Sequence, residues 1–248
     1  MDRSHLLTLK MKKIGIIGYG DFGKFLEKHL QNYFEVEIFD RKSLADISVD
    51  DEMEAKRINS VDFLIFAVTL NGLEDVCQKL QHKLNKQIVL IDVMSIKVRP
   101  IEMMQSFFPE NKILATHPIF GPQSGKNGLK DLPIVLTNVS LSEGLYIGIK
   151  TFLLEKFELK VIERTLEQHD IEMAYIQGLS HFIGKALEAL DIKDYETKTY
   201  SYSQLLKLRE LVGGDSFELY KTIQNGNPHA KKVRQDFLDA LENLQNNN

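Results

Sequence analysis

An apolar segment followed by three spaced glycines sets the strongest limit on the fold of this chain. Residues 14–17 form an apolar strand pattern, Gly18, Gly20 and Gly23 follow it, and a helical pattern continues to Leu30. In such a strand–turn–helix unit the first glycine allows a tight turn, the second lets the backbone approach a pyrophosphate, and the third lets the helix pack closely on the strand. The pattern predicts a dinucleotide site, and a glycine-rich turn that binds no nucleotide is the alternative. The candidate cofactor-binding residues of this turn are Gly18, Tyr19, Gly20, Asp21, Phe22 and Gly23.

An acidic residue lies about twenty residues beyond the glycines, where a dinucleotide-binding unit often has one. A second strand pattern starts at Glu35 and leads into Asp40. Its carboxylate can accept hydrogen bonds from the adenosine ribose and would repel a 2'-phosphate, which favours NAD. Arg41 stands next to it and would favour NADP, so NADP stays the alternative.

Apolar strand patterns then alternate with amphipathic helical patterns, which predicts a mostly parallel, Rossmann-like sheet with helices on both faces. Helices are expected near residues 73–83, from Pro100 and from about Ser142. Ligands of such sheets bind beyond the carboxyl ends of the strands. That rule singles out Val68 and Thr69 as cofactor contacts, together with residues 92–97 and 116–118. The further strand patterns cover residues 61–68, 87–93, 112–118, 132–137 and 158–164.

The pattern changes at Thr165, after which no further strand is expected. Thr165 and Gln168 form a capping box that opens a helix predicted to run to Leu190. At 100° per residue a polar stripe follows this otherwise apolar helix, formed by Asp170, Ala174, Gln177 and His181.

Three more helices are expected in this part of the chain, the first of them near residues 205–212. A second capping pair, Asp215 and Glu218, and a last helix from Asn227–Pro228 complete an all-helical region. Its apolar faces exceed what one chain can cover, which predicts a homodimer formed through these helices.

The predicted organisation therefore has three parts. Residues 1–11 form an N-terminal extension, with Met11 as an alternative start, residues 12–164 form the nucleotide-binding domain, and residues 165–248 form a helical substrate and dimerisation domain. The active site is expected between the two domains.

Composition narrows the partners and the location. The formal net charge is -4 with scattered Lys and Arg, which argues against nucleic acid. No apolar run reaches the roughly 18 residues of a membrane span, so no membrane association is expected. Cys77 is the only cysteine, which excludes an intrachain disulfide and a cysteine-based zinc cluster and suits the cytoplasm. No metal site is expected, and the start of the chain does not have the pattern of a signal peptide.

The order of these motifs resembles the prephenate and arogenate dehydrogenases of tyrosine biosynthesis. The glycine turn, "DVMSIK" at 92–97, "THPIFGPQSG" at 116–125 and "HDIEMAYIQGLSHF" at 169–182 carry the resemblance, and His-Pro-Ile-Phe-Gly-Pro is its most specific part. It implies NAD(P)-linked oxidative decarboxylation of prephenate or arogenate, in which His117 accepts the ring hydroxyl proton and Ser95 helps to hold that hydroxyl. It also implies that Ser180 and His181 of the second domain lie beside the substrate. The candidate substrate contacts are Gln123, Gln177, Ser180, His181, Arg209 and Arg234, with either arginine holding a carboxylate.

Other interpretations stay open for these residues. His117 at a strand end could serve only the backbone, and Ser95 with Lys97 could merely shape a turn. His181 could be a buried helix histidine satisfied by Gln177 or by a neighbouring helix. A different two-domain hydroxyacid dehydrogenase or imine reductase would usually need a lysine on the long helix, where Lys185 is present but lies one turn past the polar stripe. A non-catalytic NAD(H)-sensing module would need only the glycine turn and the acid.

Overall fold

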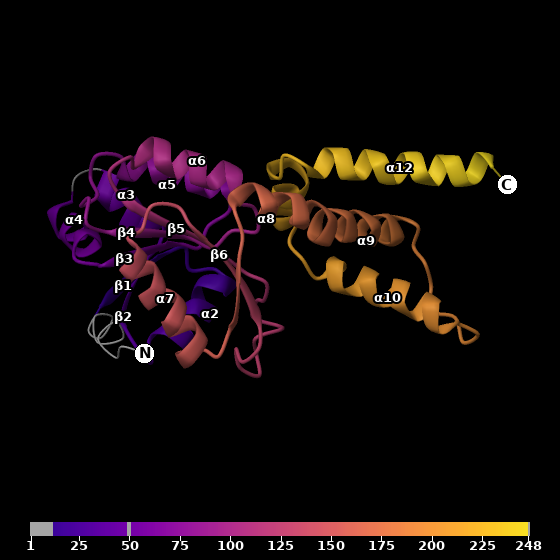
Figure 1. The fold of residues 1–248 in the computed structure, drawn as a ribbon, viewed down its shortest axis with the longest axis horizontal. Coiled ribbons are helices and arrows are strands. Elements are labelled where there is room, and N and C mark those ends of the chain that lie inside the picture. The colour runs from indigo at the N-terminus through magenta and orange to yellow at the C-terminus, as the bar shows by residue number, and fades with distance from the viewer. Residues whose placement is uncertain (1–11, 49–50, 248) are drawn as a thin grey trace. The chain divides into compact units, whose positions relative to one another are not determined.

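The computed structural model describes residues 12–48 and 51–247, and the chain divides into two compact units after Leu166 (Figure 1). The expected N-terminal extension, residues 1–11 with Met11, lies outside the described residues. Each unit has its own arrangement of elements.

The first unit is built on a seven-stranded sheet of order β2-β1-β3-β4-β5-β6-β7. All neighbouring strands are parallel except β5 and β6, which are antiparallel. The expected mostly parallel, Rossmann-like sheet is therefore confirmed. The strands are β1 (Lys13–Ile17), β2 (Glu35–Phe39), β3 (Phe63–Phe66), β4 (Val89–Asp92), β5 (Lys112–Pro118), β6 (Pro133–Asn138) and β7 (Lys160–Glu163).

Helices cover both faces of this sheet, which explains why the central strands β3 and β4 are apolar runs without alternation. Along β3, Leu64 and Phe66 belong to the core formed with α3 to α6, whereas Phe63 and Ile65 belong to the core formed with α2 and α7. The helices are α2 (Asp21–Leu30), α3 (Arg41–Ser48), α4 (Glu52–Asn59), α5 (Leu70–Leu80), α6 (Val98–Phe107) and α7 (Glu143–Lys156).

The sequence patterns did not predict α3 and α4, and two other helices start earlier than expected. Both missed helices have eight residues, and side chains at their starts supply the signal. The Asp51 carboxylate caps α4 by accepting the N–H groups of Met53 and Glu54 at 3.0 Å. The Thr69 hydroxyl caps α5 and starts it at Leu70 rather than Leu73, and α6 starts two residues before Pro100.

The second unit is helical, and no strand follows β7 among the described residues, as expected. The long helix is not regular, however, because a π-helical segment, η1, interrupts it. A π-helix has wider turns than an α-helix, so the polar stripe counted at 100° per residue does not continue through it. Asp170 and Ala174 are fully buried, whereas Gln177 and His181 are partly exposed. The elements are α8 (Leu166–Met173), η1 (Ala174–Leu179), α9 (Ser180–Ala189), α10 (Tyr200–Gly213), α11 (Phe217–Lys221), η2 (Thr222–Gly226) and α12 (Ala230–Asn246).

Two expected helix starts in this unit are wrong. Ser216, not Asp215, caps α11, because its hydroxyl accepts the Leu219 N–H at 3.2 Å. The last helix starts at Ala230 rather than at Asn227, whose side chain instead donates to the Asp170 carbonyl at 2.7 Å. The described residues contain no helix long and apolar enough to span a membrane.

Candidate active site

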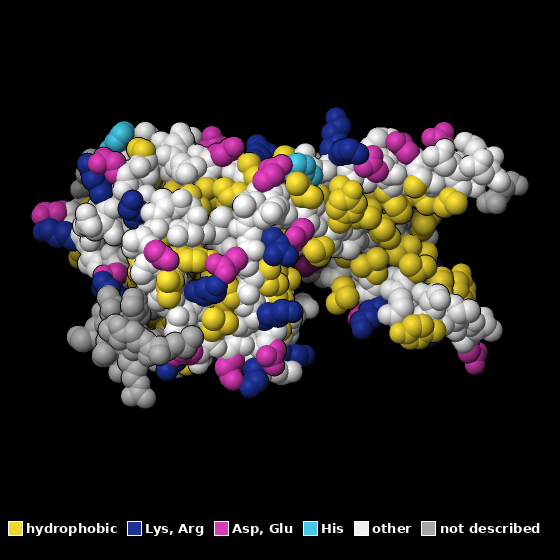
Figure 2. Space-filling model, viewed as in Figure 1, with side chains coloured by type: hydrophobic (Ala, Val, Ile, Leu, Met, Phe, Trp, Pro, Cys, Tyr) yellow, Lys and Arg dark blue, Asp and Glu magenta, His cyan; other side chains and the backbone are white. Residues whose placement is uncertain are grey.

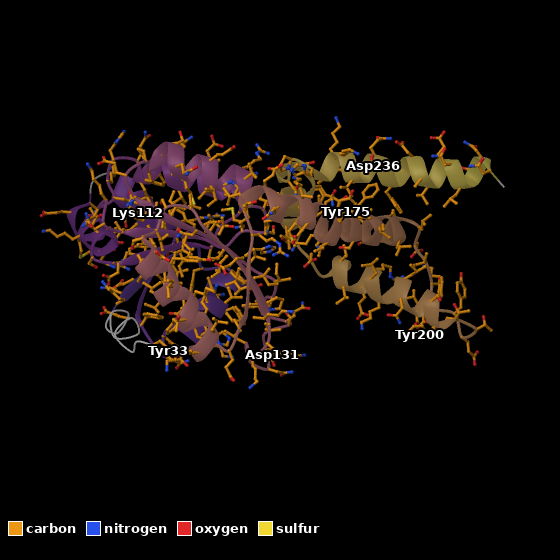
Figure 3. All side chains as sticks on the ribbon, viewed as in Figure 1. Tyr33, Lys112, Asp131, Tyr175, Tyr200 and Asp236 are labelled. Carbon is orange, nitrogen blue, oxygen red and sulfur yellow. The ribbon has the colours of Figure 1, made fainter. Side chains whose placement is uncertain are left out.

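Several strands of the first unit end at one edge of the sheet, and the predicted site residues follow them. β1, β3, β4 and β5 are parallel, and β1 pairs with β2 on one side and with β3 on the other, so the strand order reverses there. A crevice at such a reversal is where doubly wound sheets bind ligands. Lys112, labelled in Figure 3, begins β5, and His117 lies at its other end.

The three glycines after β1 differ in what the fold demands of them. Gly18 has a φ of +98°, and a side chain there would meet the Ala67 carbonyl oxygen at 2.3 Å. A Cβ on Gly23 would lie 2.0 Å from the Gly18 oxygen. Gly20, in contrast, has nothing within 4 Å of an added Cβ, and it stands at the N-cap of α2 without a capping side chain. The fold therefore needs Gly18 and Gly23, whereas the space at Gly20 and the helix N–H groups behind it suit an anion.

The side chains within this turn divide between surface and core. Tyr19 is exposed and donates to Glu27 at 2.5 Å, a hydrogen bond that raises the pKa of Tyr19. Asp21 is exposed at the start of α2. Phe22 stacks on Phe25 at 5.9 Å and packs against the core, so its side chain is structural.

Asp40 is placed directly after β2 and caps α3. One carboxylate oxygen accepts the N–H groups of Lys42 and Ser43, each at 2.9 Å, and the bond from Ser43 lowers the pKa of Asp40. The Asp40 carboxylate is thus exposed, and one of its two oxygens is used to cap α3. Arg41, also exposed, is the first residue of α3.

Val68 and Thr69 follow β3 at the same edge of the sheet. Val68 is half-buried, and Thr69 is exposed, with its hydroxyl accepting the Gly72 N–H at 3.2 Å. Capping α5 is therefore a structural role of Thr69, and a cofactor contact stays a prediction for both residues.

A buried ionic network, not predicted from the sequence, connects the ends of β4 and β5. Asp92 and Lys97 form an ion pair in which both side chains are almost completely buried. The Lys97 ammonium also donates to the Thr116 carbonyl at 2.7 Å, while the Thr116 hydroxyl donates to the Asp92 carbonyl at 2.7 Å. The second Asp92 oxygen accepts the Met94 N–H at 2.9 Å. The signal in the sequence was a lysine five residues after an aspartate at a strand end.

Ser95 and His117 are attached to this network through the backbone. Ser95 lies in the loop between Asp92 and Lys97, and its hydroxyl oxygen is buried without a hydrogen-bond partner in residues 12–48 and 51–247. His117 follows Thr116, is 4% exposed and pairs in register with Val135 on β6. An unsatisfied buried hydroxyl usually indicates a missing partner. A buried hydroxyl in the loop after β4 and a buried imidazole near the end of β5 thus follow neighbouring strands at the same end of the sheet.

Gln123 lies in the loop that follows β5 and is exposed. The loop is closed locally, because the Gly125 N–H donates to the Gly121 carbonyl at 2.8 Å and the Ser124 hydroxyl accepts the Gly121 N–H at 3.0 Å. The structure therefore puts Gln123 on a short, ordered turn beyond the strand that carries His117.

In the second unit, Gln177, Ser180 and His181 lie around the junction of η1 and α9. The Ser180 hydroxyl donates to the Ile176 carbonyl at 2.6 Å, within its own helix. Gln177 Oε1 and His181 Nδ1 are buried and lack hydrogen-bond partners in the described part of the chain. His181 Nε2 lies 3.6 Å from the Asp215 carboxylate, and burial lowers the pKa of His181. His181 Nδ1 and Gln177 Oε1 thus do not hydrogen-bond each other, and each can form a hydrogen bond with a further group.

The two candidate arginines are engaged differently. Arg209 donates to the Ile192 carbonyl in the connection after α9. Arg234, on α12, donates to the carbonyl of Gln224 at 2.9 Å and to its side-chain oxygen at 2.5 Å, and the Gln224 amide donates to the Gly178 carbonyl at 2.7 Å. Arg234 is thereby connected to η1 next to Gln177.

Comparison with protein families decides the relationship. A family model described as "Prephenate dehydrogenase, nucleotide-binding domain" matches residues 35–163, just over half of the chain. The chain belongs to the prephenate dehydrogenase family. A second model, "TYRAAT1-like, C-terminal domain", matches residues 186–247. The first match begins after the glycine turn, so the assignment of that turn rests on its own geometry.

Individual relatives agree with the family. Arogenate dehydrogenase 1, chloroplastic, of Arabidopsis thaliana is 30% identical over 94% of this chain and 38% of its own length. Arogenate dehydrogenase 2, chloroplastic, of the same plant is 29% identical over 94% of this chain and 66% of its length. This chain thus spans less than two thirds of either relative. A crystal structure of prephenate dehydrogenase from A. aeolicus, in complex with hydroxyphenyl propionate and NAD+, has the same fold, with a TM-score of 0.71 at 16% identity over 96% of this chain and 91% of that one.

Proposed function

We propose that this protein oxidatively decarboxylates prephenate to 4-hydroxyphenylpyruvate, or arogenate to tyrosine, with NAD as the acceptor and NADP as the alternative. Membership of the family and the relatives named arogenate dehydrogenase support this activity. The observation that carries the proposal is the buried Ser95 hydroxyl, which has no partner among the described residues, at the sheet edge where His117 lies near the end of β5.

The residues around the glycine turn fit a dinucleotide. Space at Gly20 and the uncapped start of α2 suit the pyrophosphate, with the backbone of residues 18–23 around it. Asp40 has one carboxylate oxygen on the helix it caps, and its other oxygen would accept the ribose hydroxyls. Val68 and Thr69 would border the same crevice. When bound, NAD accepts the hydride from the ring carbon that bears the hydroxyl.

His117 and Ser95 supply the acid–base chemistry in this proposal. Loss of hydride makes that carbon electron-poor, and removal of the hydroxyl proton by neutral imidazole relieves it, a type of proton transfer that contributes about 10²- to 10⁴-fold in rate. The ring carboxylate then leaves as CO2, its bonding electron pair enters the ring, and the ring oxygen takes a proton back to give the aromatic phenol. Ser95 would satisfy its hydroxyl on the same substrate oxygen and so fix the ring for His117. Burial of His117 keeps competing water away from the proton transfer.

The polar atoms of the second unit are proposed to contact the substrate. Gln177 Oε1 and His181 Nδ1 are buried without partners and would gain them from the substrate, with Ser180 and Gln123 at its border. Either Arg209 or Arg234 would bind a carboxylate.

Lys185 argues against the imine reductase and hydroxyacid dehydrogenase alternatives. Its ammonium forms a partly exposed ion pair with Glu188 at 2.7 Å on α9 and so already has a partner. A catalytic lysine is expected to be buried and free of such a partner.

We also propose a homodimer formed through the second unit, in the cytoplasm. The helices of this unit expose large apolar side chains, visible as a hydrophobic surface over α9 and α10 in Figure 2. Tyr175 and Tyr200, labelled in Figure 3, are 55% and 81% exposed, and Leu211 is 62% exposed. A two-fold partner with the same helices would cover them. The single cysteine, Cys77, is buried and unpaired, as is usual in a reducing compartment.

The test is NADH formation by the purified protein with prephenate and with arogenate, followed by absorbance. We expect turnover with at least one of them. His117→Asn should retain NAD binding and lower kcat by about 10²- to 10⁴-fold, because the amide cannot accept the proton. His82→Asn, the same change at an exposed residue, is the matched control and should leave kcat unchanged. NAD binding without NADH formation would identify a sensing module instead, and normal turnover of His117→Asn would remove His117 from the mechanism.

A further inference from the structure

The first unit contains a cavity on the face of the sheet opposite to His117. Successive residues of a strand point to opposite faces. Leu114, Thr116 and Pro118 line the cavity, so His117, between two of them, lies on the other face. The cavity has a volume of about 120 Å³ and lies between the sheet and the helices α2 and α7. It therefore lies on the opposite side of β5 from His117, although Val93, Thr116 and Pro118 at the carboxyl ends of β4 and β5 belong to its lining.

The lining is apolar except for two side chains, and neither requires a polar guest. The Thr116 hydroxyl is already used, because it donates to the Asp92 carbonyl at 2.7 Å. Burial lowers the pKa of His29, which favours its neutral form, and its ring packs edge-on against Phe25 at 4.7 Å. A buried water needs two to four polar partners, so a cavity with this lining stays dry.

Size and lining together select the kind of molecule that would enter. An engineered cavity of about 150 Å³ lined by Leu, Ile and Phe binds benzene or xenon, and the present cavity is of similar volume. Phe34, Phe152 and Phe157 line it, with ring centroids 5.0 Å apart in the first pair and 5.3 Å apart in the second. Aromatic rings pair best in edge-to-face or offset geometry. Such a cluster offers ring faces and edges to an aromatic guest.

We propose that this cavity is a binding site for a small molecule with a single uncharged aromatic ring. Half-buried side chains, His29, Phe34 and Leu153, form part of the lining, so the guest can enter without unfolding the core. The guest would pack against Thr116 and Pro118, the neighbours of His117 in the sequence, from behind the strand. This proposal does not depend on the proposed dehydrogenase activity.

Thermal unfolding of the full chain with increasing benzene tests the proposal. We expect a saturable rise in Tm of a few degrees once benzene exceeds its Kd by about tenfold. Benzoate, a ring of similar size with a charge that the lining cannot pair, should give no rise. Ile149→Phe, on α7 in the lining, should fill the cavity and abolish the response, whereas Ile147→Phe, on the same helix but outside the lining and 44% exposed, should keep it.

Three outcomes would overturn the proposal. They are no saturable rise with benzene, an equal rise with benzoate, or an equal response in Ile149→Phe and the native chain. If Ile149→Phe does not fold, crystals of the native chain under xenon pressure replace it. Xenon density between α2 and α7, beside Phe152, is expected, and its absence would refute the site.

Discussion

Replacing Lys97 by methionine should destabilise the first unit strongly, although methionine matches the length of the lysine stem. Lys97 is 1% exposed and its partner Asp92 is 0% exposed. The variant leaves that carboxylate buried without its cation, a change that costs about 3–5 kcal/mol. The Thr116 carbonyl also loses its 2.7 Å donor, which moves the expected cost toward the upper end of that range.

The measurement is urea or thermal unfolding of the native chain and its variants. With total stabilities of about 5–15 kcal/mol, we expect Lys97→Met to lower Tm by roughly 6–20 °C. Asp92→Asn combined with Lys97→Met removes both charges and should recover most of the loss, because the amide oxygen can still accept the Met94 N–H. Lys185→Met removes a partly exposed ion pair with Glu188 and, as the matched control, should cost less than about 1 kcal/mol.

The comparison of single and double variants distinguishes an unpaired buried charge on Asp92 from a simple loss of packing at Lys97. If Lys97→Met lies within about 1 kcal/mol of the native chain, the pair is not desolvated as described. If the double variant is as unstable as Lys97→Met, the uncompensated Asp92 charge is not the cause. Either result would refute the proposed cost of leaving the Asp92 charge unpaired. Unfolding is measured without NAD or substrate, so the test does not depend on the proposed activity.

Three further predictions follow from the same structure. Gly20→Ala should weaken NAD binding, measured by titration, with little change in the Tm measured by calorimetry. Gly23→Ala should lower Tm because its Cβ would meet the Gly18 oxygen at 2.0 Å. Equal effects of the two variants on Tm would contradict this prediction. Asp40→Ser, which keeps a helix-capping oxygen, should weaken NAD and relatively favour NADP without the stability loss of Asp40→Ala; a native preference for NADP would argue against the ribose contact. Light scattering at micromolar concentration should give the mass of a dimer for the native chain and of a monomer for Ile176→Glu, because the Ile176 side chain on η1 is 55% exposed. A fully active monomer of the native chain would exclude a dimer formed through the helices of the second unit.

The sequence alone predicted the architecture of the first unit because its signals are local. The turn at Gly18 needs a positive φ that glycine supplies, and each buried strand is an apolar run of a few residues. The carboxyl ends of such strands are known once the strands are known, so His117 and Ser95 could be named as candidates, and their catalytic roles stay predictions. The end of the strands at Glu163 was equally visible in the sequence.

Tertiary structure decided what depends on residues far apart in the chain. Lys97 finds Asp92 and the Thr116 carbonyl only because β4 and β5 are neighbours, so its ionic role was hidden in what looked like a turn. The polar stripe on the long helix was predicted at 100° per residue, which assumes a regular α-helix, and the π-helical segment η1 interrupts that geometry. The cavity arises from imperfect packing of α2 and α7 on the sheet, since segments from Ile14 to Leu159 surround it. Local patterns fix which elements form and where they begin, but buried charge pairs, wide helical turns and voids follow from how distant side chains fill space together.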